Sequence, residues 1–160
     1  MSPSAPGWNP TKPKSLAGYL EALSRPVFST GMNWRVVEAK WSDISAAFYG
    51  FDPVRVAAMT PDDVERLVQD PRVIRNRKKL EATIQNAERM LELDRGAGGF
   101  AAWLDSLGSF EDTVAGLRRE FRFLGDSGTY LFLWSVDRPT PPHQEWFQAH
   151  RQSSRRRGAA

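Results

Sequence analysis

The segment Phe121–Tyr130 combines residue types that bind phosphate groups. Within it a leucine precedes a glycine, and small polar residues then open an apolar run. A glycine at a helix start lets backbone N–H groups approach an anion closely, and a nearby arginine adds positive charge. We therefore predict contacts to a phosphate backbone from Arg122, Gly125, Ser127, Gly128 and Thr129. Taken alone, the same pattern is also typical of an ordinary turn between two helices.

Basic residues are gathered in three parts of the chain. The formal net charge is only +3, although the sequence pI is near 9.5. The acids are concentrated elsewhere, as in residues 62–65. Such segregation suits a polyanionic partner, and a set of solvated surface faces is the alternative. The clusters are Arg72, Arg75, Arg77, Lys78 and Lys79; then Arg118, Arg119 and Arg122; and finally Arg155, Arg156 and Arg157.

The cysteine and histidine content restricts the chemistry. The 160 residues include no cysteine, and His143 and His150 are the two histidines. Disulfides and thiolate metal sites are therefore excluded, and two imidazoles are too few for an ordinary zinc site. We predict no metal and no other cofactor. No apolar run reaches the roughly 18 residues of a membrane span, and residues 1–14 lack the apolar core of a signal peptide, so we expect a cytoplasmic protein.

Capping residues and apolar spacing predict helices along most of the chain. Ser15 can cap a first helix that ends before Pro26, because a proline disfavours helical geometry in the preceding residue. Thr60 and Pro61 begin another helix, with acids in its first turn. The longest helix is expected at about 77–95. Two more are expected, one opening near Asn33 with Trp34, Val37 and Trp41 on a face, and one running from Ser109 to about Arg119.

The apolar segment 129–136 is compatible with a buried strand or a buried helix. No partner strand is evident elsewhere in the sequence, so we predict a helix, followed by a short helix that carries Trp146 and Phe147. The predicted fold class is all-α, with a helix–hairpin–helix element. We expect a single helical domain at residues 15–151, an extended or disordered arm at 1–14 and a basic, disordered tail at 152–160.

Residues 31–90 carry a distinctive series of motifs. They are Gly31-Met32-Asn33-Trp34, Phe51-Asp52-Pro53-Val54, the run Pro61–Asp70, Val73–Leu80 and Gln85-Asn86-Ala87. This series resembles the DNA-3-methyladenine glycosylase I family, a branch of the helix-hairpin-helix DNA glycosylases. The resemblance covers about residues 27–135. The stretch at 120–125 is similar to the family's Gly-Phe-Lys/Arg-Phe-Val-Gly, with Glu120 in place of the first glycine.

The resemblance implies a base pocket around Trp34. From the residues alone, a tryptophan at the start of an apolar helix is more commonly part of the core. The family's Gly-Leu-Ser-Trp motif, however, places this tryptophan against the extruded base. Asn33 belongs to the same motif, and Phe28 and Tyr130 are plausible companions. An aromatic wall of this kind would favour a cationic methylated adenine over the normal base.

The chain departs from the family in three respects. It lacks the family's Cys/His zinc site and its N-terminal Tyr-His-Asp/Glu-Trp-Gly segment. The pocket glutamate, eight positions before the motif tryptophan, corresponds to Pro26 here. Glu38 lies one turn after Trp34 and is our candidate catalytic carboxylate, with an ordinary surface glutamate as the alternative. Asp126 and Asp137 are further candidates, and each could instead cap a turn.

The resemblance implies a monofunctional glycosylase of base excision repair. Such an enzyme would flip an alkylated base such as 3-methyladenine out of double-stranded DNA and hydrolyse its N-glycosidic bond. We expect a monomer that binds damaged duplex DNA and no membrane. Two alternatives remain open: a catalytically silent DNA-binding module that keeps the fold, and a structural or protein-interaction domain. A base-release assay beside a DNA-binding titration discriminates among the three.

Overall fold

The computed structural model describes residues 9–96, 98–142 and 144–146. Within these ranges every regular element is helical, which confirms the predicted all-α class. The elements are α1 (Leu16–Ser29), α2 (Trp34–Ala39), α3 (Trp41–Ala47), the 3₁₀ helix η1 (Tyr49–Phe51), α4 (Pro53–Ala57), α5 (Pro61–Val68), α6 (Arg77–Gly96), α7 (Phe100–Asp105), α8 (Phe110–Glu120) and α9 (Asp126–Ser135).

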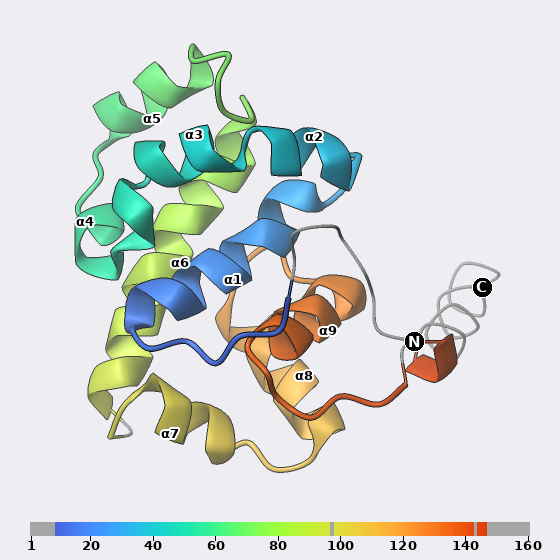
Figure 1. Ribbon diagram of the computed structural model, residues 1–160. Coiled ribbons are helices and arrows are strands. Elements are labelled where there is room, and N and C mark those ends of the chain that lie inside the picture. Colours follow the sequence, from blue (N-terminus) through green and yellow to red (C-terminus); the bar gives the residue numbers. More distant parts are fainter. Residues whose placement is uncertain (1–8, 97, 143, 147–160) are drawn as a thin grey trace, which may run out of the picture.

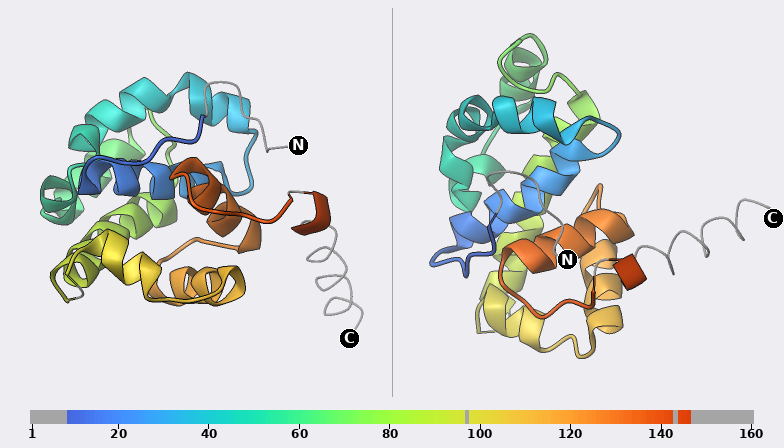
Figure 2. Two further views of the ribbon diagram at one scale, coloured as in Figure 1. Left: turned by 60° about the horizontal axis from the view of Figure 1, so that its bottom comes forward. Right: turned by 45° about the vertical axis from the view of Figure 1, so that its right-hand side comes forward.

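Two helices organise the domain (Figure 1). The long helix α6 runs through the molecule, and α1 packs against it. Helices α2 to α5 gather around one end of this pair, whereas α7, α8 and α9 gather around the other (Figures 1 and 2). Helix α1 also packs against α9, so it contacts both groups. Residues 121–125 join α8 to α9 and complete the predicted helix–hairpin–helix element.

Side-chain caps fix the helix starts that the sequence predicts. The Ser15 hydroxyl accepts a hydrogen bond from the N–H of Gly18 at the start of α1. Thr60 and Asp63 form a reciprocal capping box at the start of α5, with Pro61 in the first turn. The Ser109 hydroxyl accepts from the N–H of Asp112 in α8. Each cap satisfies backbone donors that have no partner within the helix.

The expected end of the first helix is wrong. Helix α1 continues through Pro26 to Ser29, and the two residues after the proline, Val27 and Phe28, are fully buried. Burying these two apolar side chains outweighs the one backbone hydrogen bond that a proline removes. The backbone N–H and the hydroxyl of Thr30 both donate to the Pro26 carbonyl, at 3.1 and 2.9 Å, and close the helix end.

The helix expected near Asn33 is divided into α2 and α3. Lys40 separates them with φ −97° and ψ 0°. Its Nζ donates to the carbonyl of Pro71 at 2.7 Å, which ties the break to the loop before α6. Because of the break, Trp41 is buried and stacks on Phe51, whereas Trp34 stays exposed. The two tryptophans therefore do not share a face.

The remaining expectations concern the C-terminal half and the two ends. Residues 129–136 lie mostly in α9, which confirms the helical alternative. Residues 144–146 are helical, and Phe147 lies outside the described residues. The N–H of Thr11 donates to the carbonyl of Ser135, so part of the expected arm lies along the domain. Residues 1–8 and 152–160 lie outside the described residues, and the domain boundaries stay predictions.

Candidate nucleic-acid interface

The tryptophan turn, residues 31–35, joins α1 to α2 and presents an aromatic side chain to solvent. Gly31 has φ +73°, a conformation that favours glycine. The Asn33 side chain accepts a hydrogen bond from the N–H of Arg35 and caps α2. The Trp34 side chain is 36% exposed, and the Arg35 guanidinium lies 5.4 Å from its ring centroid. Asn33 is thus engaged as a helix cap, while Trp34 is accessible to a base.

A buried lysine fixes the end of α1 from which this turn starts. Lys79 in the first turn of α6 is 3% exposed, and its Nζ donates to the carbonyls of Phe28 and Thr30, at 2.8 and 2.5 Å. These carbonyls lack intrahelical partners, so the ammonium acts as a C-terminal cap. Burial lowers the pKa of Lys79. The expectation that Lys79 belongs to an exposed, phosphate-gripping cluster is therefore wrong.

Two of the expected pocket residues lie inside the core. Phe28 is fully buried and packs against Trp41 and Phe48. Tyr130 is also buried, its ring lies near that of Phe110, and its hydroxyl donates to the carbonyl of Pro141. Both rings are enclosed by protein and present no open face to a base in this structure. The sequence could not distinguish these aromatics from Trp34, because all three lie in apolar segments.

Glu38 is held in an ion pair. Its two carboxylate oxygens lie 2.8 and 2.9 Å from Nη1 of Arg25 in α1. The Arg25 guanidinium also lies 4.8 Å from the centre of the Trp41 ring, and the Trp41 Nε1–H donates to Glu21. Glu21 and Arg25 line a cavity of about 290 Å³ beside residues 9–13. A carboxylate in this position can stabilise positive charge that develops nearby. Glu21 and Arg25 were not predicted from the sequence, because the only sequence feature that relates them is their i, i+4 spacing.

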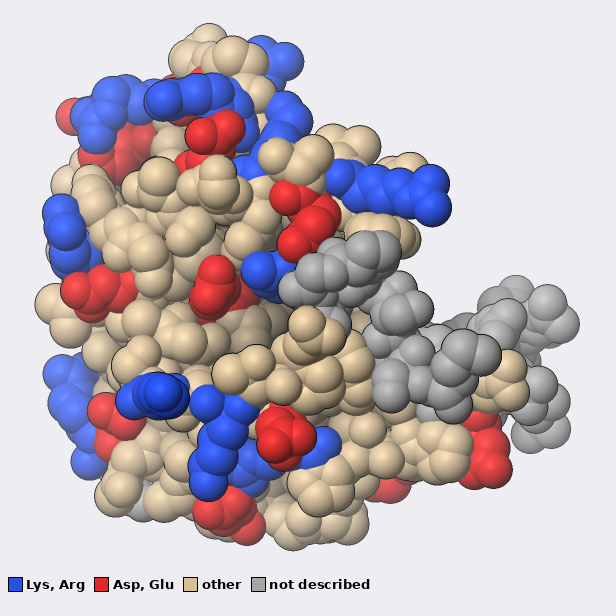
Figure 3. Space-filling model, in the orientation of Figure 1, with Lys and Arg blue, Asp and Glu red and all other residues tan. Residues whose placement is uncertain are grey.

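The exposed cations differ in whether an acid neutralises them. Among the described residues, Arg75, Lys78 and Arg122 are exposed and form no ion pair. Arg77 instead pairs with Glu65 at 2.5 Å, and this pair lowers the pKa of the Glu65 carboxyl. Arg72 pairs with Asp70. On the face seen in Figure 3, a row of basic side chains follows the upper edge, while acids are interspersed over much of the rest.

The hairpin, residues 121–125, has a mixed character. Gly125 precedes α9 as expected, and Ser127 is exposed. The hydroxyl of Thr129, however, donates to the Gly125 carbonyl, and its side chain is buried. Asp126 at the helix start forms an ion pair with Arg118 at 2.6 Å. A carboxylate at this position opposes a phosphate at the same helix terminus.

The hairpin lies close to the tryptophan turn. A Cβ built on Gly128 would stand 3.2 Å from the Cβ of Pro26, so the start of α9 packs closely on the last turns of α1. Lys79 brings the start of α6 to the same end of α1. In the right-hand view of Figure 2 these parts lie along one edge of the molecule. The structure thus brings the start of α6, the start of α9 and the tryptophan turn to the same end of α1, whereas the rings of Phe28 and Tyr130 are buried in the core.

Two other kinds of site receive no support from the described residues. Within them no group of three or more His, Asp or Glu side chains could hold a metal ion. No helix in the same ranges has the length and apolar character needed to cross a membrane.

Comparison with known proteins identifies the family. The sequence pattern of the methyladenine glycosylase family matches residues 12–120, which run from before α1 through the tryptophan turn to the end of α8. The chain belongs to this family. The chain is also 40% identical over 124 residues to DNA-3-methyladenine glycosylase 1 of Escherichia coli (strain K12), covering 64% of this chain and 66% of that protein. It is 27% identical to DNA-3-methyladenine glycosylase of Haemophilus influenzae, covering 66% of this chain and 69% of that one.

Solved structures of the family share the fold. A structure that describes 3-methyladenine recognition by 3-methyladenine DNA glycosylase I from Staphylococcus aureus superposes with a TM-score of 0.70 at 26% identity, covering 83% of this chain and 87% of that one. A crystal structure of 3-methyladenine DNA glycosylase I gives 0.68 at 27% identity, with 79% and 81% covered. The methyladenine glycosylase domain is therefore recognisable in both sequence and structure, although this chain spans just under two thirds of the length of its E. coli relative.

Proposed function

We propose that this protein is a DNA glycosylase of base excision repair that removes alkylated purines such as 3-methyladenine from double-stranded DNA. Membership of the methyladenine glycosylase family supports the reaction class. The observation that carries the proposal for this chain is the exposed Trp34, held at a helix start by the Asn33 cap and the Gly31 turn. An extruded base is recognised by stacking on such an aromatic surface.

The proposed chemistry needs little acid assistance. Methylation at N3 makes the adenine cationic, so the base takes both electrons of the C1′–N bond and leaves as a neutral molecule. Water adds to C1′ and loses a proton, which completes hydrolysis. The protein then contributes by holding the flipped nucleotide and by stabilising positive charge on the sugar.

Glu38 is our proposed source of that stabilisation. It lies one turn after Trp34 and pairs with Arg25. Arg25 offsets part of its charge, and Glu21 nearby adds a second carboxylate. The three side chains together carry a net charge of −1, which suits the positive charge that passes from the base to the sugar as the C1′–N bond breaks. Glu38→Gln keeps the side-chain volume and should slow base release without preventing DNA binding.

A second candidate function is a catalytically silent DNA-binding module. The observation that favours it is Pro26, which stands where the resembled family has its pocket glutamate and which is buried in α1. Such a module would bind duplex DNA through the same surface and release no base.

The test is release of free base from methylated duplex DNA. The wild-type protein should liberate 3-methyladenine, detected by chromatography, and should leave unmethylated DNA of the same sequence intact. A parallel titration with fluorescent duplex should show binding. Binding with no base release would establish the silent module and reject the enzyme, whereas the absence of both would reject the two proposals together.

A further inference from the structure

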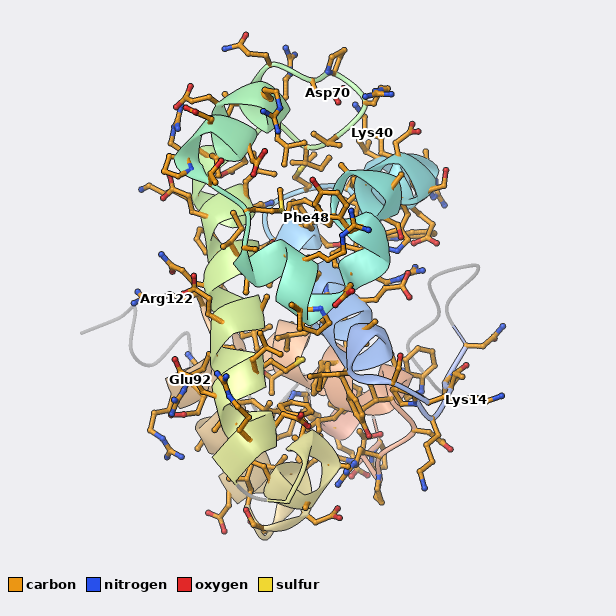
Figure 4. All side chains as sticks on the ribbon, turned by 90° about the vertical axis from the view of Figure 1, so that its left-hand side faces the viewer. Lys14, Lys40, Phe48, Asp70, Glu92 and Arg122 are labelled. Atoms are coloured by element: carbon orange, nitrogen blue, oxygen red, sulfur yellow. The ribbon has the colours of Figure 1, made fainter. Side chains whose placement is uncertain are left out.

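A buried amide joins the middle of α6 to the hairpin. Asn86 is 2% exposed, its Oδ1 accepts from the N–H of Arg122 at 2.8 Å, and its Nδ2 donates to the carbonyl of Arg122 at 3.2 Å. Both ends of one side-chain amide thus bond to both backbone groups of one residue, 36 positions along the chain. Figure 4 shows Arg122 beside the middle of α6. Two bonds to the same residue fix the position of that backbone more tightly than one.

Two exposed residues of the hairpin lie between two buried ones. Phe121 and Leu124 are buried, whereas Arg122 and Phe123, between them, are exposed. Phe123 has φ +60°, which a residue with a side chain rarely adopts. Such a conformation persists only where the surrounding contacts impose it. The Asn86 contact at the preceding residue and the burial of Leu124 after it impose it here.

A second contact secures the beginning of the hairpin to the same helix. Nη2 and Nε of Arg89, one turn after Asn86, lie 2.5 and 3.1 Å from Oε2 of Glu120, the last residue of α8. Glu120 is largely shielded from solvent. This ion pair holds the end of α8 but makes no contact with the backbone of Arg122. Asn86 therefore has a distinct task, which is to place the exposed tip.

We propose that Asn86 is a positioning residue for DNA binding: it holds the hairpin so that the Arg122 cation and the Phe123 ring project from the surface that meets the duplex. This inference rests on the proposed function, because it assigns the hairpin tip to the DNA-binding surface. It also gives a role to Asn86 within the Gln85-Asn86-Ala87 motif, which the base pocket does not explain. Asn86 acts through Arg122 and Phe123 and touches no reacting atom.

The test compares Asn86→Leu with Thr83→Val. Leucine has a similar volume to asparagine but forms neither hydrogen bond. Thr83 is a matched control because it is fully buried on α6, and its hydroxyl bonds only to the Lys79 carbonyl within the helix. Asn86→Leu should weaken duplex binding about tenfold, because a released hairpin tip must be ordered again when the duplex binds. The slope of log affinity against log salt should fall by about 0.9, which is the contribution of one phosphate contact. Thr83→Val should leave both unchanged.

Hydrogen exchange at the Arg122 amide tests the hairpin without DNA. That N–H is bonded to Asn86 Oδ1, so its exchange in Asn86→Leu should accelerate at least about tenfold beyond any change at amides in the middle of α9. Asn86→Ala also removes both hydrogen bonds and should give the same result. It avoids placing leucine methyl groups against the backbone of Arg122, so it provides a second variant if the leucine variant does not fold.

The outcomes separate this inference from the proposed function. Faster exchange at Arg122 with unchanged DNA affinity and salt slope would overturn the positioning role while leaving the glycosylase proposal intact. Equally weak binding in Asn86→Leu and Thr83→Val would also overturn it, because any buried substitution in α6 would then reduce duplex affinity. A wild-type protein that binds DNA without releasing base would reject the enzyme, yet the Asn86 comparison would still be decided by binding and exchange.

Discussion

The tryptophan turn and the hairpin each present an aromatic side chain and a cation, but they are held differently. Trp34 and Arg35 lie at a capped helix start whose supporting helix end is secured by the buried Lys79. Phe123 and Arg122 lie in a strained connection secured by Asn86. In addition, the hairpin leads to an acid, Asp126, whereas residues 31–35 contain none. Under the proposed function, the turn would receive the base, and Asp126 would offset part of the attraction of the hairpin for phosphate.

The largest effect should come from the ring in the turn. Trp34→Ala should cut release of methylated purine roughly 5- to 150-fold, because stacking contributes about 1–3 kcal/mol per base. The control is Tyr49→Ala, since Tyr49 is an exposed aromatic that also stacks on an arginine, with the Arg55 guanidinium 4.1 Å from the ring centroid. Full activity in a folded Trp34→Ala protein would remove the turn from the base-binding site.

Cations without acid partners should dominate DNA binding. Arg75→Ala combined with Lys78→Ala should lower the slope of log affinity against log salt by about 1.8, since each phosphate contact contributes about 0.9. The matched variant carries Arg72→Ala and Arg77→Ala, both of which face acids in this structure. It should lower the slope less. Equal slopes for the two double variants would contradict the distinction between paired and unpaired cations.

Features of the fold that depend on contacts between neighbouring residues could be predicted from the sequence, whereas features that depend on contacts between distant residues could not. The caps at Thr60 and Ser109 are local, and they were predicted from spacing alone. The path of α1 through Pro26 was not, because it depends on burial of Phe28 against distant helices. The same distinction applies to the candidate site residues, because long-range contacts decide which of them are buried.

Lys79 and Lys78 show the limit most clearly. They are adjacent members of one basic run, yet one is buried and caps α1 while the other is exposed. Their charge and their position in the sequence predict the same role for both, which is binding to a phosphate. Only the approach of α1 to the first turn of α6, a contact between residues about 50 positions apart, separates them.

A smaller effect should come from the acid that follows the hairpin. Asp126→Ser should tighten duplex binding about two- to fivefold, because it removes a negative charge from a helix start and releases Arg118 from its ion pair. Glu111→Ser is the control, since Glu111 is an exposed acid in the first turn of α8. Binding that weakens in Asp126→Ser would show that the carboxylate supports the interface.

The smallest effect concerns acid stability of the loop before α6. Hydrogen bonds from Arg72 lower the pKa of Asp70 from 3.8 to about 2. A depressed folded-state pKa adds stability above pH 3.8, and that contribution is lost as the pH falls toward 2. The difference in unfolding free energy between wild type and Asp70→Asn should therefore shrink over this window. Urea titrations at several pH values measure it, and a constant difference would contradict the assignment.

Lys79 also links the flexibility of the tryptophan turn to that of the long helix. If the end of α1 unwinds locally, the buried ammonium of Lys79 loses its two carbonyl partners. The unwound state is unfavourable unless water reaches this charge. Local fraying at residues 28–30 is therefore suppressed, and the end of α1 should open together with the first turn of α6 rather than alone. The tryptophan turn, which would bind a flipped base, would then follow a helix end as rigid as the core. Little conformational entropy would be lost there when DNA binds.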